Sequence, residues 1–207
     1  MSRQVYFVTG TDTDVGKTYV SCHLLRAAGI QGKRTLGLKP LAAGAEQTAQ
    51  GLRNGDALLL QQAATIKLSY EQVNPFCFAP AIAPHIAAQQ SGISLTAANL
   101  ADSVMAVLNE TSADYVLIEG AGGWCVPIND AETLADVAAL LSFPVLLVVG
   151  MKLGCLNHAL LTAEAICADG LGWAGWVAND LGDPMPHFAE NIAALERRLP
   201  APRMRVD

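Results

Sequence analysis

Short and almost wholly apolar segments recur along this chain, and longer segments with helical periodicity separate most of them. The clearest are Val5–Thr9, Tyr115–Glu119 and Val145–Val149, which are rich in β-branched residues. A strand that is apolar on both sides has to be covered on both sides, and strands joined through helices run parallel. The pattern therefore predicts an α/β fold with a doubly wound, mainly parallel sheet and helices on both faces.

The other predicted elements continue this alternation. We expect further strands at Thr35–Lys39 and Trp173–Ala178. The predicted helices are Lys17–Ala28, Asp56–Ala64, Leu95–Asn109, Leu156–Ala168 and His187–Leu199. The stretch Asn74–Gln90 contains three prolines and is predicted to be an irregular loop that crosses the carboxyl edge of the sheet. Ligands of open α/β sheets bind at that edge.

Size and charge limit the classes of function. The 207 residues, 52% of them hydrophobic, can bury one core, so we expect a single domain over residues 1–207. The net charge of −6 and the lack of Lys or Arg runs argue against nucleic-acid and membrane partners. The sequence enters its first strand without a leader, and its longest apolar run, Phe143–Gly150, is too short to span a bilayer. We expect a cytoplasmic protein.

The cysteines do not form a recognisable metal or redox motif. They are odd in number and scattered, and no C-x-x-C pair occurs. We expect reduced thiols that mostly serve packing at Cys22, Cys77, Cys125, Cys155 and Cys167.

A glycine-rich segment, G-T-D-T-D-V-G-K-T over residues 10–18, joins the first strand to the first helix. Such a turn can direct backbone N–H groups and a helix N-terminus at phosphate oxygens. Gly16 lets the backbone approach closely, Lys17 can reach the β- and γ-phosphates, and Thr18 can bind Mg²⁺. Five residues separate the glycines instead of the usual four, and an ordinary turn is the alternative for this segment alone. Its strand–helix context favours a Mg·ATP site of the P-loop NTPase type.

Charged residues occur where predicted strands end. Glu119 closes the strand Tyr115–Ile118, where a carboxylate can hold Mg²⁺, although a solvated loop acid is the alternative. Lys39 ends the second strand, and an ammonium there can stabilise phosphoryl transfer or simply be solvated. Asp56 can cap the following helix or bind the metal.

Two further segments are candidates for ligand contacts. Asn179 and Asp180 follow a strand, where an amide can contact a purine or serve a turn, and the missing N-K-x-D pattern favours adenine. Residues 151–158 open a helix with unpaired N–H groups, a second possible anion site. We expect His158 to pack on its helix and Cys155 to have no nucleophilic role.

Eight short segments together carry a specific resemblance. They read G-T-D-T-D-V-G-K-T, K-P-L-A-A-G, L-R-N-G-D-A-L, V-N-P-F, P-H-I, E-G-A-G-G-W, K-L-G-C-L-N-H-A and G-W-V-A-N-D. Over roughly residues 5–200 the chain closely resembles the dethiobiotin synthetases, which use ATP and CO₂ to close a ureido ring on 7,8-diaminopelargonate. The long glycine spacing is itself typical of that family.

The resemblance implies roles for particular residues. Lys17 and Thr13 would address phosphates, Asn179 would contact adenine, and Lys39 together with Lys17 would be catalytic. The implied Mg²⁺ ligands are Thr18, Asp56 and Glu119. The full nucleotide site would comprise Thr13, Asp14, Val15, Gly16, Lys17, Thr18, Tyr19, Asp56, Glu119, Gly120, Ala121, Gly122, Asn179 and Asp180.

The resemblance also implies a substrate site and a reaction. CO₂ forms a carbamate on one amine, ATP phosphorylates it, and the neighbouring amine expels phosphate. The substrate carboxylate would lie on N–H groups contributed by the other subunit of a homodimer. The implied substrate residues are Ala43, Gly154, Cys155, Leu156 and Asn157.

The chain departs from the family pattern at three places. Ala43 replaces a usual serine, which removes a hydrogen bond worth about 0.5–1.5 kcal/mol. Asp14 replaces a glutamate and has a shorter reach. The sequence ends at residues 205–207, whereas relatives continue through a proline-containing segment that helps to wall the adenine pocket and through a closing helix.

Two other classes of protein share parts of this pattern. A partner-switching ATPase of the ParA/MinD type has the same fold, but its additional loop lysine and a basic amphipathic tail are missing here. An amidotransferase-coupled synthetase of the cobyrinate type needs a glutaminase domain for which this chain is too short.

Overall fold

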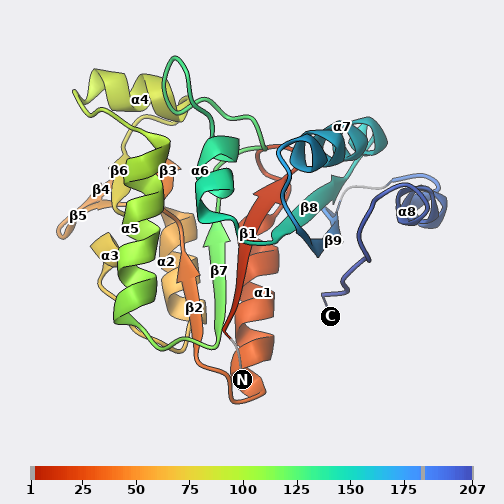
Figure 1. Cartoon of the computed structure of the whole chain (residues 1–207), viewed down its shortest axis with the longest axis horizontal. Helices are drawn as coiled ribbons and strands as arrows, with labels where there is room; N and C mark the ends of the chain where they lie inside the picture. The colour runs from red at the N-terminus through yellow and green to blue at the C-terminus, as the bar shows by residue number, and fades with distance from the viewer. Residues whose placement is uncertain (1–2, 183–184, 207) are drawn as a thin grey trace.

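A parallel sheet forms the centre of the protein (Figure 1). The computed structural model describes residues 3–182 and 185–206. The five-stranded sheet has the order β2-β7-β1-β8-β9, and each neighbouring pair is parallel. The strands are β1 (Gln4–Gly10), β2 (Thr35–Leu38), β7 (Tyr115–Glu119), β8 (Val145–Met151) and β9 (Trp173–Asp180). The predicted parallel α/β sheet is confirmed.

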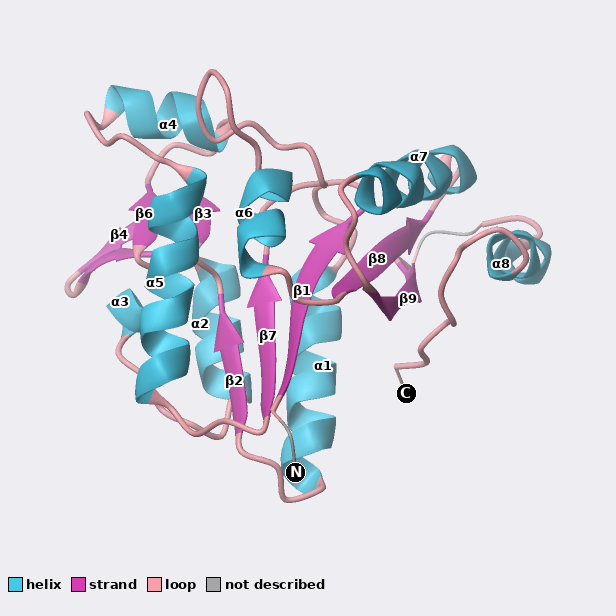
Figure 2. Ribbon diagram, in the orientation of Figure 1, coloured by secondary structure: helices cyan, strands magenta, loops and turns pink. Residues whose placement is uncertain are grey.

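Helices cover both faces of this sheet (Figure 2). The longer helices are α1 (Lys17–Ile30), α2 (Gly55–Ala63), α5 (Ala97–Glu110), α6 (Leu134–Leu141), α7 (Cys155–Ala168) and α8 (Phe188–Glu196). Side chains alternate along a strand, and β8 shows the consequence. Leu146 and Val148 pack in the cluster that includes α1 and α2, whereas Leu147 and Val149 pack with α7 and α8. The sheet is therefore doubly wound.

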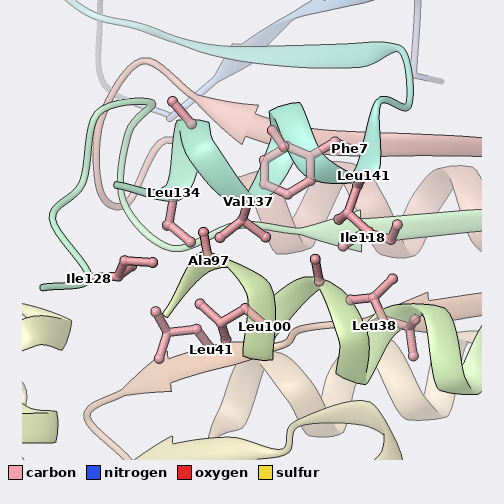
Figure 3. Packing of buried hydrophobic residues seen from close by; sticks show 14 of the residues in the cluster. Phe7, Leu38, Leu41, Ala97, Leu100, Ile118, Ile128, Leu134, Val137 and Leu141 are labelled. Atoms are coloured by element: carbon pink, nitrogen blue, oxygen red, sulfur yellow. The ribbon is translucent and has the colours of Figure 1, made fainter. Parts of the chain in front are cut away.

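The largest core cluster lies between the sheet and the helices α5 and α6 (Figure 3). Phe7 and Ile118 project from β1 and β7 towards Leu100 of α5 and Val137 of α6. Each fully buried side chain of this size contributes about 1.5–3 kcal/mol. Thr96 caps α5 by accepting a hydrogen bond from the Asn99 N–H, so the helix begins at Ala97 and not at the predicted Leu95.

Several short elements lie between β2 and α5, and the sequence did not predict them. They are β3 (Leu41–Ala43), β4 (Glu46–Thr48), β5 (Gly51–Arg53), α3 (Tyr70–Val73), β6 (Phe76–Phe78) and α4 (Pro84–Gln90). The strand β3 pairs parallel with β6, and β4 pairs antiparallel with β5. The predicted irregular loop Asn74–Gln90 is therefore wrong, because β6 and α4 occupy most of it. Strands of three residues are too short to show a periodicity.

A missed helix and the end of one strand also need correction. Helix α6 was missed because its sequence, L-A-D-V-A-A-L-L, is apolar nearly all round and runs close to the equally apolar β8. The predicted strand Trp173–Ala178 is two residues too short, because Asn179 and Asp180 are the last two residues of β9. There they pair in register with Gly150 and Met151 of β8.

The outer edge of β9 is covered by a later part of the chain. The Trp176 N–H donates to the Pro202 carbonyl at 3.1 Å, and the Met204 N–H donates to the Trp176 carbonyl at 2.7 Å. These bonds satisfy backbone groups that an open sheet edge would leave unpaired. Asp207, where the sequence ends, lies outside the described residues.

The structure also bears on the cysteine and membrane predictions. All five cysteines are free thiols, as predicted. The packing role holds for Cys22 and Cys155, which are buried, but is wrong for Cys125 and Cys167, which are exposed. Within residues 3–182 and 185–206, no helix is both long and apolar enough to cross a membrane.

Candidate nucleotide and substrate site

The glycine-rich segment forms a tight loop between β1 and α1. Asp14 and Gly16 have left-handed φ angles of 57° and 85°. Val15 points inward and is fully buried, because Gly10 and Gly150 leave room for it. A Cβ on Gly10 would lie 2.6 Å from a Val15 methyl carbon, and one on Gly150 would lie 2.8 Å away. The buried Val15 side chain thus anchors the loop to the sheet, and the loop backbone remains free to contact a ligand.

Helix α1 begins where an anion would be bound. Gly16 is its N-cap residue, and within residues 3–182 and 185–206 no side chain caps the first N–H groups. The buried Lys17 ammonium donates to the Asp12 carbonyl at 3.0 Å. Burial, followed by the charge of Lys39, lowers the pKa of Lys17 from 10.5 to about 8. A phosphate group at this helix N-terminus would supply a nearby negative charge and so stabilise the Lys17 ammonium.

A buried charge cluster lies next to the loop. Glu119 ends β7 opposite Val8 of β1 and is fully buried. Its Oε1 atom accepts a hydrogen bond from the Thr18 hydroxyl at 2.6 Å and from the Lys39 ammonium at 2.9 Å. Lys39 also lies 3.4 Å from Asp56 Oδ2. Two strand ends and the first turns of α1 and α2, far apart in sequence, therefore bring a hydroxyl, two carboxylates and an ammonium together.

Lys39 is 4% exposed, yet its charge is stabilised. Burial by itself would lower the pKa of the Lys39 ammonium, but the charges of Glu119 and Asp56 and the hydrogen bonds to them outweigh burial and raise it. The ammonium also donates to the Gly120 carbonyl at 3.3 Å. Lys39 is therefore an ionised group held at a defined place.

The same cluster has the chemistry of a magnesium site. The Oε2 atom of Glu119 is buried and has no hydrogen-bond partner among the residues that the structure describes. Hydroxyl and carboxylate oxygens are the ligands that Mg²⁺ takes in nucleotide sites. The residues Thr18, Asp56 and Glu119 fit that ion, and the Lys39 ammonium already shows that the two carboxylates favour a cation between them.

A cavity of about 1040 Å³ opens over the phosphate loop and the charge cluster. Most of the predicted site residues line it, and this set consists of Thr13, Asp14, Gly16, Lys17, Thr18, Tyr19, Lys39, Ala43, Asp56, Ala121 and Gly122. Apolar residues also line it, among them Ala42, Leu59 and residues 81–84, and we call these the apolar wall. The cavity therefore offers charged groups to a phosphate chain and apolar contacts to an alkyl chain.

Five predicted nucleotide residues lie outside the cavity lining. Val15, Glu119 and Gly120 are buried beneath it. Asn179 donates from Nδ2 to the Val15 carbonyl at 2.9 Å, and a Cβ on Gly16 would lie 2.1 Å from the same nitrogen. Asp180 is exposed and accepts from the Gly182 N–H at 2.9 Å. Asn179 thus contacts the back of the phosphate loop.

The predicted carboxylate-binding residues do not line the cavity. Gly154 has a φ of 95° and begins α7 without a side-chain cap. Cys155 is buried, Leu156 is half-buried and Asn157 is exposed. His158 is also exposed, so its predicted packing against the helix is wrong, because it faces outward from the first turn. Within one chain the two parts of the predicted substrate site are separate.

Sequence reasoning missed several residues that shape the site. Asp12 pairs with Lys152 at 3.3 Å, which links the phosphate loop to the segment before α7. A hydrogen bond from the Thr13 N–H, with Lys152, lowers the pKa of Asp12. Asn54 lines the cavity and caps α2, a role that its position before an apolar helix could have indicated. Residues 81–84 line the cavity because of tertiary packing, and no local sequence pattern indicated this position.

Comparison with known proteins identifies the family. A family model described as an AAA domain matches residues 4–204. The ATP-dependent dethiobiotin synthetase BioD of Cellvibrio japonicus is 58% identical over 202 residues, which cover 98% of this chain and 88% of the relative. This chain belongs to the ATP-dependent dethiobiotin synthetase family. The dethiobiotin synthetase of Pseudomonas aeruginosa strain PAO1 is also similar, with 56% identity over 197 residues, 95% of this chain and 86% of the relative.

Solved structures agree on the fold of this dethiobiotin synthetase family member. The MinC:MinD cell division protein complex of Aquifex aeolicus contains a chain with 14% identity and a TM-score of 0.59, with 99% of this chain and 82% of that chain covered. Chloroplast FtsY from Physcomitrella patens shows 21% identity and a TM-score of 0.56, with 98% and 57% covered. At such identities the likeness concerns the P-loop NTPase fold alone. The resemblance in the eight sequence segments is confirmed.

Proposed function

We propose that this chain catalyses the ATP-dependent formation of dethiobiotin from 7,8-diaminopelargonate and CO₂, with ADP and phosphate as the other products. Family membership supports the overall reaction. The structural observation that carries the proposal is Lys39, an ionised lysine held between Glu119 and Asp56 in the same cavity as the phosphate loop. In this proposal the protein is a ligase of biotin biosynthesis.

The phosphate loop would bind the triphosphate of ATP. Backbone N–H groups of the loop and of the first turn of α1, together with Lys17, would neutralise its charge. Thr13, Asp14 and Tyr19 line the same part of the cavity. Asn179 and Asp180 would lie towards adenine, and Asn179 also holds the loop through Val15.

Lys39 and Lys17 would stabilise the charge that spreads over the transferred phosphoryl group. Both ammonium groups are buried, so their electrostatic effect is larger than in water. In the reaction a carbamate forms on one amine of the substrate and takes the γ-phosphoryl group. The neighbouring amine then attacks the carbamoyl carbon, a urea C–N bond forms and phosphate leaves. Holding both amines in one molecule favours this closure.

Magnesium would be held by Thr18, Asp56 and Glu119. Bound there, the ion would supply charge neutralisation for the phosphate oxygens. The unpartnered Oε2 of Glu119 supports this placement, since a buried carboxylate oxygen otherwise has an unmet need for a donor or cation.

The substrate would occupy the cavity beside Lys39 and Ala43, with its alkyl chain against the apolar wall. Its carboxylate would be bound by the N–H groups of Gly154, Cys155, Leu156 and Asn157 from a second copy of the chain. The proposal of a homodimer rests on the family resemblance and on the separation of these two groups within one chain. Nucleic acid and membranes have no role in it, and we expect a cytoplasmic enzyme.

The reaction is tested by phosphate release from Mg·ATP with and without diaminopelargonate and bicarbonate, combined with mass detection of dethiobiotin. We expect release that depends on both substrates and equals the dethiobiotin formed. Equal release in all mixtures would argue for a partner-switching ATPase and against the synthetase.

A further inference from the structure

A buried hydrogen-bond network lies behind the cavity wall and connects the segments that carry Lys39, Asp56 and Ala43. Its centre consists of Tyr70 of α3 and Asn74, which are 7% and 2% exposed. Neither side chain lines the cavity. Buried polar groups of this kind are costly unless they are satisfied, so a fully bonded network fixes the groups it joins.

Asn74 holds the backbone of Lys39. Its Nδ2 atom donates to the Lys39 carbonyl at 2.6 Å, and the neighbouring Val73 carbonyl accepts from the Lys39 N–H at 2.9 Å. Lys39 directly follows β2, the edge strand of the sheet. Its peptide groups are therefore fixed by residues 73–74 and not by a neighbouring strand of the main sheet.

Tyr70 connects this contact to α2. Its hydroxyl donates to Asn74 Oδ1 at 2.9 Å and accepts from the Asn54 N–H at 2.6 Å. Asn54 in turn caps α2 by accepting from the Ala57 N–H, and its Nδ2 atom donates to the Ala43 carbonyl at 3.4 Å. Asp56 is the second residue of that helix. Burial raises the pKa of the Tyr70 hydroxyl, which therefore stays a donor.

We propose that Tyr70 and Asn74 are positioning residues that set the place of the Lys39 ammonium relative to the carboxylates of Asp56 and Glu119. The inference rests on the proposed role of Lys39. The physical reason is that a catalytic charge acts only at the right distance from the reacting oxygens, and displacements of about 1 Å can cost about a hundredfold in rate. One hydroxyl joins both sides of the cluster, so its removal uncouples them.

The test is Tyr70→Phe, which keeps the ring and its contact with the Arg53 guanidinium, 4.1 Å from the ring centroid. We expect kcat to fall at least about tenfold, while the Kd of Mg·ATP from titration calorimetry stays within about twofold, because the phosphate loop does not touch the network. Assays are run well below the Tm of the variant. The matched control is Tyr115→Phe, since Tyr115 is equally exposed (7%) but begins β7, at the opposite end of that strand from Glu119.

Asn74→Ala tests the network from its other end, with Asn129→Ala as its control. Asn129 also donates from Nδ2 to a backbone carbonyl, that of Leu95 at 2.9 Å, but does not line the cavity. Both Asn74→Ala and Tyr70→Phe should lower kcat more than they weaken ATP binding. The Asn74 variant keeps the inference testable if the tyrosine variant does not fold.

Three outcomes would count against these ideas, and they are distinguishable. A normal kcat in both Tyr70→Phe and Asn74→Ala, with an inactive Lys39→Ala, overturns the positioning role and leaves the proposed function intact. Equal losses in kcat and ATP affinity indicate a merely structural role and also overturn it. A Lys39→Ala enzyme with normal turnover instead removes the catalytic role of Lys39 itself.

Discussion

Among single residues, Lys39 links stability and catalysis most directly, because its ammonium neutralises the buried carboxylate of Glu119. The ion pair is bonded on several sides, since Thr18 and the Gly120 carbonyl complete it. Removal of one partner of such a pair leaves an uncompensated charge in a region of low dielectric constant. The same side chain is thus expected to matter before ATP is bound as well as during turnover.

We predict that Lys39→Ala lowers turnover by more than about tenfold, roughly 1.4 kcal/mol in activation free energy. The variant should also lose about 3–5 kcal/mol in the free energy of unfolding, because Glu119 stays buried without its cation. Steady-state assays and urea unfolding measure the two effects. Lys39→Met, which keeps the aliphatic stem, separates lost packing from lost charge. Turnover within tenfold of the original enzyme would rule out catalysis by this lysine.

The lowered pKa of Lys17 leads to a pH prediction. In the free enzyme Lys17 loses its proton near pH 8, whereas bound phosphates would favour the charged ammonium and raise this pKa. The complex then holds more protons than the free enzyme, so ATP affinity should fall as pH rises through about 8.

Titration calorimetry at pH 8.5, in buffers that differ in ionisation enthalpy, should reveal proton uptake on ATP binding. The phosphates of ATP are already ionised there, since their last pKa lies near about 6. Lys17→Arg is the control, because a guanidinium stays charged and should abolish the uptake. Binding without proton transfer in the original enzyme would show that Lys17 does not face the phosphates.

At the scale of elements, the phosphate loop depends on contacts from three strands and not on its own sequence alone. Val15 fills the space beside Gly10 and Gly150, and Asn179 of β9 packs on Gly16. We therefore expect the loop to keep its shape before a nucleotide binds. This preorganisation reduces the entropy cost of binding.

Gly16→Ala should disrupt this loop. The new Cβ would lie 2.1 Å from Asn179 Nδ2, and the φ of 85° adds a strain of about 1–2 kcal/mol. We expect the Kd of Mg·ATP to rise at least about tenfold in calorimetric titrations. Gly170→Ala is matched, since its φ is 72° but no atom in the described part of the chain lies within 4 Å of the added carbon. Similar ATP affinities in the two variants would show that the close approach of Asn179 is unimportant.

At the scale of the whole molecule, the N-terminus of α7 is near the phosphate loop through the Lys152–Asp12 pair, but residues 154–157 do not line the cavity of their own chain. In the proposed homodimer each site would combine Lys39 of one copy with residues 154–157 of the other. Such a shared site makes a specific prediction for mixtures of inactive variants.

Lys39→Ala and Asn157→Asp should each be inactive, the second because its new charge repels the substrate carboxylate. When the two proteins are unfolded together and refolded in equal amounts, half of the dimers should be mixed and contain one intact site. Dethiobiotin formation should recover to about a quarter of the original activity. Each variant refolded alone is the control. No recovery in mixed dimers would mean that each site uses residues of one chain only.

The sequence by itself determined the parallel sheet, the longer helices around it except α6, and the position of the phosphate loop. These features depend on local periodicity and on backbone rules for glycine, which neighbouring residues alone express. Thr18, Lys39 and Glu119 could be named for the same reason, because each lies at the end of a strand or the start of a helix. Their roles as a set came from the family resemblance.

Only the tertiary structure decided which of these groups meet and what supports them. The buried contact of Lys39 with Glu119 joins residues 80 positions apart, and the link from Tyr70 through Asn74 to Lys39 has no local signal. The short strands β3 and β6 likewise exist because they pair with each other. Such contacts depend on the packing of distant segments, and the free energy that stabilises them arises only when the whole sheet has formed.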